Sequence, residues 1–447
     1  MSKTIKTNDG EILSAEEKRE LRRQRRVRNL VFAYVGLVIF VLALAVGIFF
    51  GIRALQSVLN EKEQVQQIEE QLSMMEQEEN GMQEEELPVM AGQPSEAELL
   101  DEIISSRISQ MTLEEKVAGL FIVTPESITG VGTAVQAGDG TREALEKYPV
   151  GGIIYSKQNI QSEEQIKTML ANTASYSKTP LFLAVDEEGG SVTRVAAALN
   201  LENVGNMSDI GASQDAGQAY AAMQNVGTYL SGYGFNLDFA PMADVMTNPE
   251  NDAIAKRSFG SDAALVSDMV VAAANGLKDS GITSCLKHFP GIGSAGEDTH
   301  NGLVLVEKSL EELQQTDLLP FITGIEAGVP MIMVGHISLP QVVGDNTPAS
   351  MSSVVIADLL RGQLGFNGVV ITDAMDMKAI TEYYGADEAA IMALRAGADM
   401  ILMPEDFELA FEGVITAVQD GTISEERIND SLTRVYRIKY ADSVGAE

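Results

Sequence analysis

The chain has 447 residues, of which 45% are hydrophobic, so it can form one large barrel with extensions or two or three average domains. Its formal net charge is −34, and a surface this acidic repels phosphate backbones, which argues against nucleic acid as a partner. A single cysteine, Cys285, excludes an internal disulfide bond.

The first 52 residues have the pattern of a membrane anchor. Residues 1–29 carry nine basic and five acidic side chains, a net +4 against −38 for the remainder. Residues 30–52 form an uncharged apolar run, and a helix of this length spans a hydrocarbon core of about 30 Å. A cleaved signal peptide is the alternative, but no small-residue cleavage site precedes Arg53. The basic flank predicts a cytoplasmic N-terminus and an extracellular remainder, joined by a single-pass helix in the cell membrane.

Residues 53–94 are rich in Glu and Gln, with scattered Val, Ile, Leu and Met. The apolar positions are too irregular to define a heptad repeat, although a short helix or coiled coil within the segment stays open. We expect an acidic, solvated linker or stalk that extends the reach of the domain after it.

Residues 95–447 alternate between strand-like and helical patterns. Eight short apolar runs lie at 121–124, 151–156, 181–186, 235–242, 282–289, 330–337, 368–373 and 398–404. Helical patterns lie at 96–120, 162–177, 262–280, 310–327, 352–364 and 424–440. Continuous β-branched runs suit parallel strands that are buried on both faces. The alternation predicts an α/β fold with a (β/α)8 TIM-like barrel; a doubly wound open sheet competes, but no Gly-rich dinucleotide fingerprint supports it.

Polar or ionisable side chains cluster where these runs end, namely Asp186, Asp244, Lys287, His288, His336 and Asp373. In a barrel, the carboxyl ends of the strands meet around one mouth, where active sites are built. A single acid at a strand end usually caps the next helix. The convergence of several such groups indicates an enzyme, without specifying its reaction.

Three of these side chains allow more than one interpretation. Asp373 could be a nucleophile or an electrostatic stabiliser of a sugar cation, or it could be the N-cap of a helix that starts near Met375. Lys287 and His288 stand side by side before a Pro-Gly turn. They could clamp substrate hydroxyls, or Lys287 could form a Schiff base; a surface lysine beside a core histidine is the plainest alternative.

Asp298 and His300 lie two residues apart in a Gly-rich stretch. They could form a hydrogen-bonded dyad that replaces a carboxylic acid as the proton donor, and a solvated polar loop is the alternative. A metal site has little support, because the chain has only three histidines and no HExxH spacing.

Asp186 ends its apolar run in the sequence DEEGG, whose glycines let the backbone approach a ligand closely. Glu187 and Glu188 could contribute, but adjacent acids at a strand end are often turn residues. Arg257 could make a bidentate contact to a substrate oxygen or to an active-site acid, or it could be a surface arginine.

Taken in order, these segments resemble family 3 glycoside hydrolases, and in particular the bacterial β-N-acetylglucosaminidase (β-hexosaminidase) branch that acts on cell-wall sugars. The resemblance covers roughly residues 97–440 and is carried by MTLEEKVAGLF, VGGIIYS, AVDEEGG, GFNLDFAPMADV, RSFG, CLKHFPGIG with DTH, MVGHI and GFNGVVITDAMDMKAI. KHFPG and TDAMDMKAI are the specific motifs among these.

The resemblance implies a role for each candidate residue. Asp373 matches the nucleophile that forms the glycosyl-enzyme intermediate, and Asp298 with His300 matches the general acid/base dyad. The residues that match sugar-binding positions of the first subsite are Asp186, Arg257, Lys287 and His288. Neither a metal nor an organic cofactor is implied.

Two positions depart from the pattern of this branch. Ile292 stands where KHFPGHG has its second histidine, and Ser191 stands where an arginine commonly follows EEGG. About 45 residues follow the last apolar run, too few for a second domain. Because family 3 β-glucosidases usually draw their acid/base from such a domain, an acid/base within the barrel is needed here.

We therefore expect a membrane-anchored retaining exo-glycosidase that hydrolyses terminal β-N-acetylglucosamine residues of N-acetylglucosaminides, such as cell-wall fragments derived from peptidoglycan. Three alternatives stay open: another family 3 β-glycosidase such as a β-glucosidase or β-xylosidase, a barrel lyase or aldolase that uses Lys287, and a catalytically silent wall-binding protein. The sequence leaves the oligomeric state undetermined.

Overall fold

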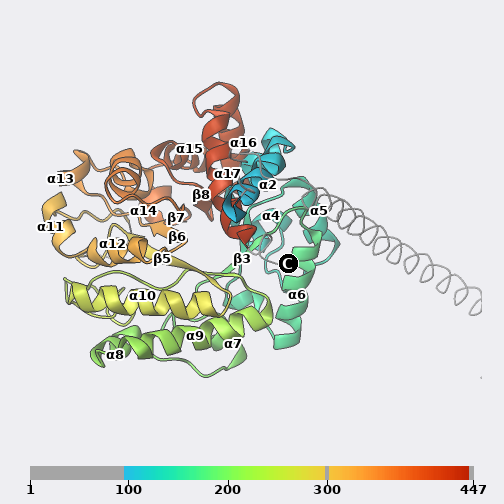
Figure 1. Cartoon of the computed structure of the whole chain (residues 1–447). Coiled ribbons are helices and arrows are strands. Elements are labelled where there is room, and N and C mark those ends of the chain that lie inside the picture. Colours follow the sequence, from blue (N-terminus) through green and yellow to red (C-terminus); the bar gives the residue numbers. More distant parts are fainter. Residues whose placement is uncertain (1–94, 297–301, 442–447) are drawn as a thin grey trace, which may run out of the picture. The chain divides into compact units, whose positions relative to one another are not determined.

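The computed structural model describes residues 95–296 and 302–441 of the chain (Figure 1). The predicted basic tail, membrane helix and acidic stalk, residues 1–94, lie outside these ranges. Within them, no helix is both long enough and apolar enough to cross a membrane. What the structure describes is the part of the chain for which a barrel was predicted.

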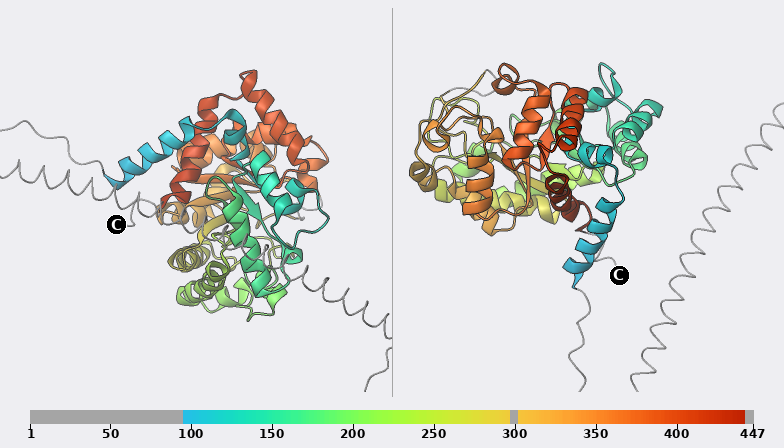
Figure 2. Two further views of the ribbon diagram at one scale, coloured as in Figure 1. Left: turned by 90° about the vertical axis from the view of Figure 1, so that its right-hand side faces the viewer. Right: turned by 90° about the horizontal axis from the view of Figure 1, so that it is seen from above.

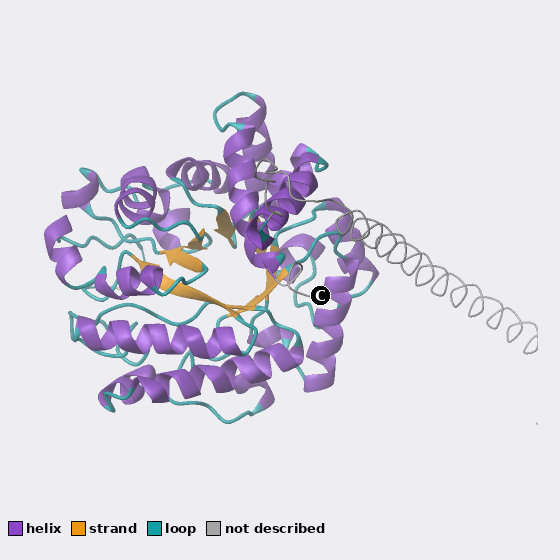
Figure 3. Ribbon diagram, viewed as in Figure 1, coloured by secondary structure: helices purple, strands orange, loops and turns teal. Residues whose placement is uncertain are grey.

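Eight parallel strands close into a barrel in chain order, with β8 beside β1. They are β1 (Phe121–Val123), β2 (Gly152–Ile154), β3 (Phe182–Val185), β4 (Leu237–Asp238), β5 (Thr283–Phe289), β6 (Met331–Val334), β7 (Val369–Ala374) and β8 (Met400–Leu402). Figure 3 shows these strands at the centre, with helices around them. Each predicted apolar run overlaps one strand, so the predicted barrel is confirmed and the open sheet is wrong.

Three predicted helices have nearly the predicted bounds: α6 (Glu163–Tyr176), α10 (Ala263–Asp279) and α17 (Glu425–Lys439). Each begins after a residue whose side-chain oxygen accepts a backbone N–H of the first turn: Ser162, Asp262 and Ser424. Such caps satisfy N–H groups that have no partner inside the helix. The segment predicted at 352–364 folds instead as a π-helix, η4 (Val354–Gln363).

Two predicted helices are each divided: 96–120 into α2 (Glu96–Ser109) and α3 (Leu113–Ala118), and 310–327 into α11 (Leu310–Gln315) and α12 (Leu319–Glu326). Thr112 starts α3 with a capping box to Glu115, so the chain begins a new helix there. Pro320 lies in the first turn of α12, where its missing N–H costs nothing, whereas inside one continuous helix it would remove a hydrogen bond.

The remaining helices are α4 (Pro125–Thr129), α5 (Asp139–Lys147), η1 (Lys157–Asn159), α7 (Val195–Leu199), α8 (Met207–Ala212), α9 (Ala216–Tyr233), α13 (Pro340–Val343), η3 (Ala349–Met351), α14 (Lys378–Thr381), α15 (Ala386–Ala396) and α16 (Phe407–Gln419). Helices α9 and α10 lie side by side (Figure 2). A Cβ at Gly276 of α10 would lie only 2.4 Å from the carbonyl oxygen of Tyr220 in α9. The absence of a side chain there allows this close packing.

A buried ion-pair cluster closes part of the barrel base, where the strands begin. Asp399, just before β8, is fully buried and lies within 3.6 Å of Arg361, Arg427 and Arg434. Its Oδ2 also accepts the Val370 N–H at 2.9 Å. One carboxylate therefore ties η4 and α17 to strands β7 and β8.

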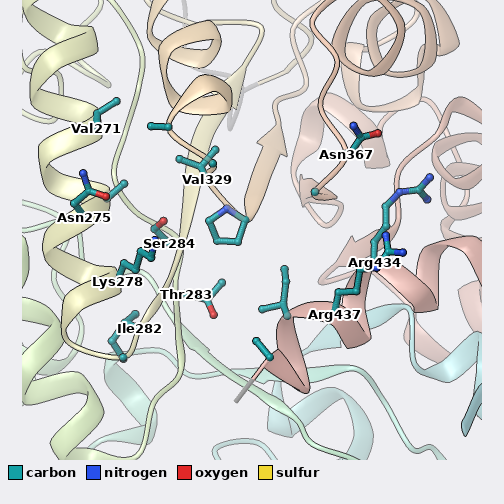
Figure 4. A pocket seen from close by; sticks show the side chains of 18 residues that line it. Val271, Asn275, Lys278, Ile282, Thr283, Ser284, Val329, Asn367, Arg434 and Arg437 are labelled. Atoms are coloured by element: carbon teal, nitrogen blue, oxygen red, sulfur yellow. The ribbon is translucent and has the colours of Figure 1, made fainter. Parts of the chain in front are cut away.

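A cavity of about 480 Å³ lies at the same base, between the first residues of β5, the segments that lead into β6 and β7, and helices α10 and α17. Figure 4 shows Lys278 on one side of it and Arg434 and Arg437 on the other. None of the predicted site residues lines this cavity. It is therefore separate from the strand ends at which the active site was predicted.

Asp399→Ala is expected to lower the free energy of unfolding by about 3–5 kcal/mol, because three partly buried guanidinium groups lose their shared carboxylate. Thermal and urea unfolding followed by circular dichroism measure this change. Arg142→Ala, which removes an exposed ion pair with Asp139, is the control and should cost less than about 1 kcal/mol. Equal losses in the two variants would contradict the role given to Asp399.

Candidate active site

Asp373 lies in β7, one residue before the strand ends at the mouth of the barrel. The pairing of β7 with β8 shifts register between Ile371 and Ala374, and such an irregularity re-aims side chains near sites. The Ala374 N–H donates to Asp373 Oδ1 at 2.8 Å. The alternative that Asp373 caps a helix near Met375 is wrong, because the next helix, α14, begins at Lys378.

The Asp373 carboxylate is held in its ionised form. Burial raises its pKa, but the electrostatic influence of His288 and then of His336 opposes that effect. The Ala374 N–H and Lys287 act in the same direction as the histidines, so that the pKa of Asp373 lies below its ordinary value. An ionised carboxylate can attack an electrophilic carbon or stabilise a developing cation.

Lys287 of β5 is only 2% exposed and lies between two carboxylates. Its Nζ is 2.7 Å from Asp186 Oδ1 and 2.6 Å from Glu188 Oε1. Burial lowers the pKa of Lys287, but the two carboxylates raise it by more, to above its ordinary value. Because a Schiff base forms from a neutral amine, this arrangement disfavours the Schiff-base interpretation. It supports a charged hydrogen-bond donor instead.

Glu188 joins Lys287 to Arg257. Arg257 donates from Nε to Glu188 Oε2 at 2.8 Å and from Nη2 to Oε1 at 2.7 Å, which makes a bidentate pair. Burial raises the pKa of Glu188, but Lys287 and Arg257 lower it by more, to well below its ordinary value. The interpretation of Glu188 as a turn residue is therefore wrong; it is the acceptor that two cations share.

The neighbouring Glu187 has a structural role. Its Oε2 accepts the backbone N–H groups of Arg194 and Val195 at 2.5 and 2.8 Å, and its Oε1 accepts the Ala196 N–H at 2.9 Å. The Tyr229 hydroxyl also donates to Oε1, at 2.8 Å. Glu187 thus caps the first turn of α7 and ties it to α9. Of these two adjacent glutamates, Glu188 therefore belongs to the site and Glu187 caps a helix.

His288 follows Lys287 in β5 and is oriented by the fully buried Asp244. Its Nδ1 lies 2.8 Å from Asp244 Oδ2, so Nδ1 carries a hydrogen, and its backbone N–H donates to the same oxygen at 3.1 Å. Asp244 Oδ1 accepts the N–H of Ile292 at 2.7 Å. Because that bond uses the backbone of Ile292, the absence of a histidine side chain there leaves the Asp244–His288 pair intact.

His336, two residues after β6, is fully buried beside β7. Its Nε2 lies 2.9 Å from the carbonyl oxygen of Ala374, and its Nδ1 lies 2.8 Å from Ser350 Oγ. Ser350 was not identified from the sequence. It lies 14 residues beyond His336 and belongs to no motif that would mark it.

The predicted dyad, Asp298 and His300, lies outside the described residues and stays a prediction. The described chain resumes at Gly302, and Leu305 forms a parallel bridge with Ser338 after β6. The segment that follows the dyad is therefore fixed beside the strand end that carries His336. In the described parts of the chain, no group of three or more His, Cys, Asp or Glu side chains is arranged to hold a metal ion.

The structure brings five predicted site residues together at one end of the barrel: Asp186, Arg257, Lys287, His288 and Asp373. Lys287 pairs directly with Asp186, and Glu188 joins Lys287 to Arg257. His288 and Lys287 both lower the pKa of Asp373. The result is an ionised carboxylate beside buried cations and hydrogen-bond donors. Such a site suits a polar substrate that develops positive charge at the attacked carbon.

The chain is similar to one curated protein in sequence and to two solved structures in fold. Beta-hexosaminidase A from Pseudoalteromonas piscicida is 35% identical over 327 residues, which cover 66% of this chain and 54% of that protein. The structure of a glycoside hydrolase family 3 beta-N-acetylglucosaminidase from Paenibacillus sp. str. FPU-7 is 38% identical with a TM-score of 0.69, covering 75% of this chain and 64% of that one. The structure of a beta-N-acetylhexosaminidase from Beutenbergia cavernae is 27% identical with a TM-score of 0.67, and the match covers 74% of this chain and 99% of that one.

The chain spans just over half the length of the Pseudoalteromonas relative and less than two thirds of the Paenibacillus protein. The sequence profile described as "Glycosyl hydrolase family 3 N terminal domain" matches residues 112–438. This match covers most of the chain, includes all eight strands and contains every predicted site residue. The chain therefore belongs to glycosyl hydrolase family 3.

Proposed function

We propose that the protein is a retaining exo-glycosidase that removes terminal β-N-acetylglucosamine residues through a covalent glycosyl-aspartate intermediate. The observation that carries this proposal is the ionised Asp373 at the barrel mouth, beside Lys287 and His288. The names of the similar Pseudoalteromonas and Paenibacillus proteins support the class of sugar.

In the proposed reaction, Asp373 attacks the anomeric carbon while His300, oriented by Asp298, protonates the departing glycosidic oxygen. Water then attacks the glycosyl-aspartate, and His300 takes the water proton as a general base. Each step inverts the configuration at the anomeric carbon, so the two steps together retain it. The reaction needs no metal ion and no organic cofactor.

The network around Lys287 would bind the hydroxyl groups of the sugar. Asp186 is its most exposed carboxylate, with 26% of the side chain accessible against 1% for Glu188, and it can accept hydrogen bonds from hydroxyls. Lys287 and Arg257 supply donors, while Glu188 fixes the position of both cations. His288, held by Asp244, would contribute a ring donor or acceptor from the same strand as Lys287.

We also propose that residues 30–52 anchor the protein in the cell membrane, with the N-terminus in the cytoplasm and the barrel outside. The 23-residue apolar run and its basic flank support this proposal. Fragments of peptidoglycan would then be the source of terminal β-N-acetylglucosamine. Because a net acidic protein is not attracted to a polyanionic wall, the anchor would set its location.

The full chain is expected to hydrolyse p-nitrophenyl N-acetyl-β-glucosaminide. Asp373→Ala should lower kcat/KM on the order of 10⁴-fold or more, because no covalent intermediate can form. His300→Ala should lower it by about 10²- to 10⁴-fold on a GlcNAc disaccharide. The loss should be smaller on the p-nitrophenyl substrate, whose leaving group needs little protonation. Release of p-nitrophenol measures turnover of the p-nitrophenyl substrate, and release of the monosaccharide measures turnover of the disaccharide.

The exposed Asp420→Asn serves as a matched carboxylate control and should keep wild-type turnover. Preference for the p-nitrophenyl glucoside or xyloside would replace the proposed specificity with that of another family 3 β-glycosidase. A folded protein that binds these sugars without turnover would instead be a binding protein.

Glu188→Gln should lower kcat/KM by about 10- to 100-fold, because two buried cations lose their shared counter-charge. Without that charge the pKa of Lys287 falls, so the alkaline limb of the pH profile should move to lower pH. Steady-state kinetics between pH 5 and pH 10 would measure both effects. Glu202→Gln, at an exposed glutamate, is the control. An unchanged profile for Glu188→Gln would show that the network does not serve the reaction.

The anchor predicts that the full chain sediments with membranes, resists extraction by alkaline carbonate and dissolves in detergent. Deletion of residues 1–52 should release active protein into the soluble fraction. Protease added to intact cells or protoplasts should degrade the barrel if it lies outside. A full chain found in the soluble fraction, or one with residues 1–52 already removed, would contradict the anchor.

A further inference from the structure

His336 and Ser350 form a buried pair to which the proposed reaction gives no role. His336 follows β6, Ser350 lies in η3, and neither side chain is exposed. The 2.8 Å contact between His336 Nδ1 and Ser350 Oγ joins these two segments. The Ser350 backbone N–H also donates to the carbonyl oxygen of Gly335 at 3.1 Å, which fixes the serine next to the ring.

The contact of the second ring nitrogen of His336, Nε2, shows which ring nitrogen carries a hydrogen. His336 Nε2 lies 2.9 Å from the Ala374 carbonyl oxygen, which can only accept, so Nε2 carries a hydrogen. In a neutral ring, Nδ1 then accepts the hydroxyl hydrogen of Ser350; in a protonated ring, Nδ1 donates to the Ser350 oxygen. Both states keep the Nε2–H of His336 directed at Ala374.

Ala374 is the residue directly after the proposed nucleophile. Its N–H donates to Asp373 Oδ1 at 2.8 Å, while its carbonyl oxygen accepts from His336. The next N–H, of Met375, donates to the carbonyl oxygen of Leu402 in β8 at 2.9 Å. Hydrogen bonds from both neighbouring strand ends therefore hold the Ala374–Met375 peptide group, at the point where β7 departs from its regular pairing.

We propose that Ser350 and His336 are positioning residues that fix the nucleophile Asp373 through the backbone of Ala374. The inference rests on the proposed function, in which Asp373 attacks the sugar. Ser350 orients the His336 ring, and His336 binds the carbonyl oxygen of Ala374, the residue whose N–H binds Asp373 Oδ1. A misplacement of about 1 Å at a reacting group can cost on the order of 10²-fold in rate, so a chain of short hydrogen bonds can control turnover strongly.

His336 also affects the charge state of Asp373. His288, then His336 and then Lys287 lower the pKa of the Asp373 carboxyl. His288 and Lys287 belong to β5, and His336 lies just after β6. Asp373 must be ionised to attack, so activity falls as the pH drops through its pKa. Loss of the His336 ring raises that pKa. The acid limb of the kcat/KM profile then moves to higher pH.

Kinetics of three full-chain variants test the proposal. Ser350→Ala should lower kcat by about 10- to 100-fold with KM changed by less than about 3-fold, because the ring loses its support while the sugar contacts stay. Ser350→Thr keeps the hydroxyl and should restore most of the loss. His336→Gln keeps an N–H donor for Ala374 without the ring charge, so its acid limb should move to higher pH.

Ser267→Ala is the matched control, because Ser267 is a buried serine whose hydroxyl donates only within its own helix, α10, to the Ala263 carbonyl oxygen at 2.7 Å. It should keep the wild-type kcat and pH profile. Wild-type kinetics in Ser350→Ala, or the same loss in Ser350→Thr as in Ser350→Ala, would overturn the positioning role.

A measurement that needs no turnover separates this inference from the proposed function. The chain has three histidines, so ¹⁵N spectra of histidine-labelled full chain can be assigned with His288→Gln and His300→Gln. His336 should carry hydrogen on Nε2 in the wild type and should sample the other tautomer in Ser350→Ala. A neutral ring with hydrogen only on Nδ1 would overturn the inference. An inactive wild type with hydrogen on Nε2 would overturn the proposed function while supporting the hydrogen-bond chain.

Discussion

The charge of Lys287 must be balanced inside the barrel, and much of the site follows from that requirement. Removing an ammonium group from water costs several kcal/mol unless carboxylates and hydrogen bonds replace the water. Asp186 and Glu188 supply this compensation from the connection after β3. Glu188 in turn forms an ion pair with Arg257, which lies in the connection after β4. Three strand ends are held together because one buried cation needs partners.

Irregular pairing of two strands places the reactive groups. The β5–β6 register shifts between Leu286 and Phe289, which brackets Lys287 and His288, and the β7–β8 register shifts around Asp373. A regular ladder would continue the alternation of side chains between the barrel interior and the surrounding helices. Where the ladder is interrupted, adjacent residues can both turn toward the mouth. The loss of regular pairing is compensated locally; for example, Thr372 Oγ1 accepts the Leu402 N–H at 3.1 Å.

The strands and the general location of the site could be predicted from the sequence, because buried parallel strands leave continuous apolar runs and their polar ends must meet at one mouth. The breaks in two helices could not be read from periodicity, since they depend on Thr112 and Pro320 as local start signals. Glu187 and Glu188 look equivalent in sequence, and only their three-dimensional partners separate them.

Ser350 could not be predicted from the sequence for a different reason. Its partner His336 is close in space through a loop without regular periodicity, so no spacing rule links the two positions. The dyad Asp298–His300 lies outside the described residues and stays a prediction that the family resemblance implies.

Helix α2 lies at the base of the barrel, where the strands begin. Asp101 of α2 pairs with Arg437 of α17 at 2.8 and 2.9 Å. Met111, just after α2, shares a surface hollow with Pro149 and Thr179, which precede β2 and β3. Helices α2 and α17, which pack against each other, therefore cover part of the base of the barrel, on the side opposite the strand ends that carry Lys287 and Asp373.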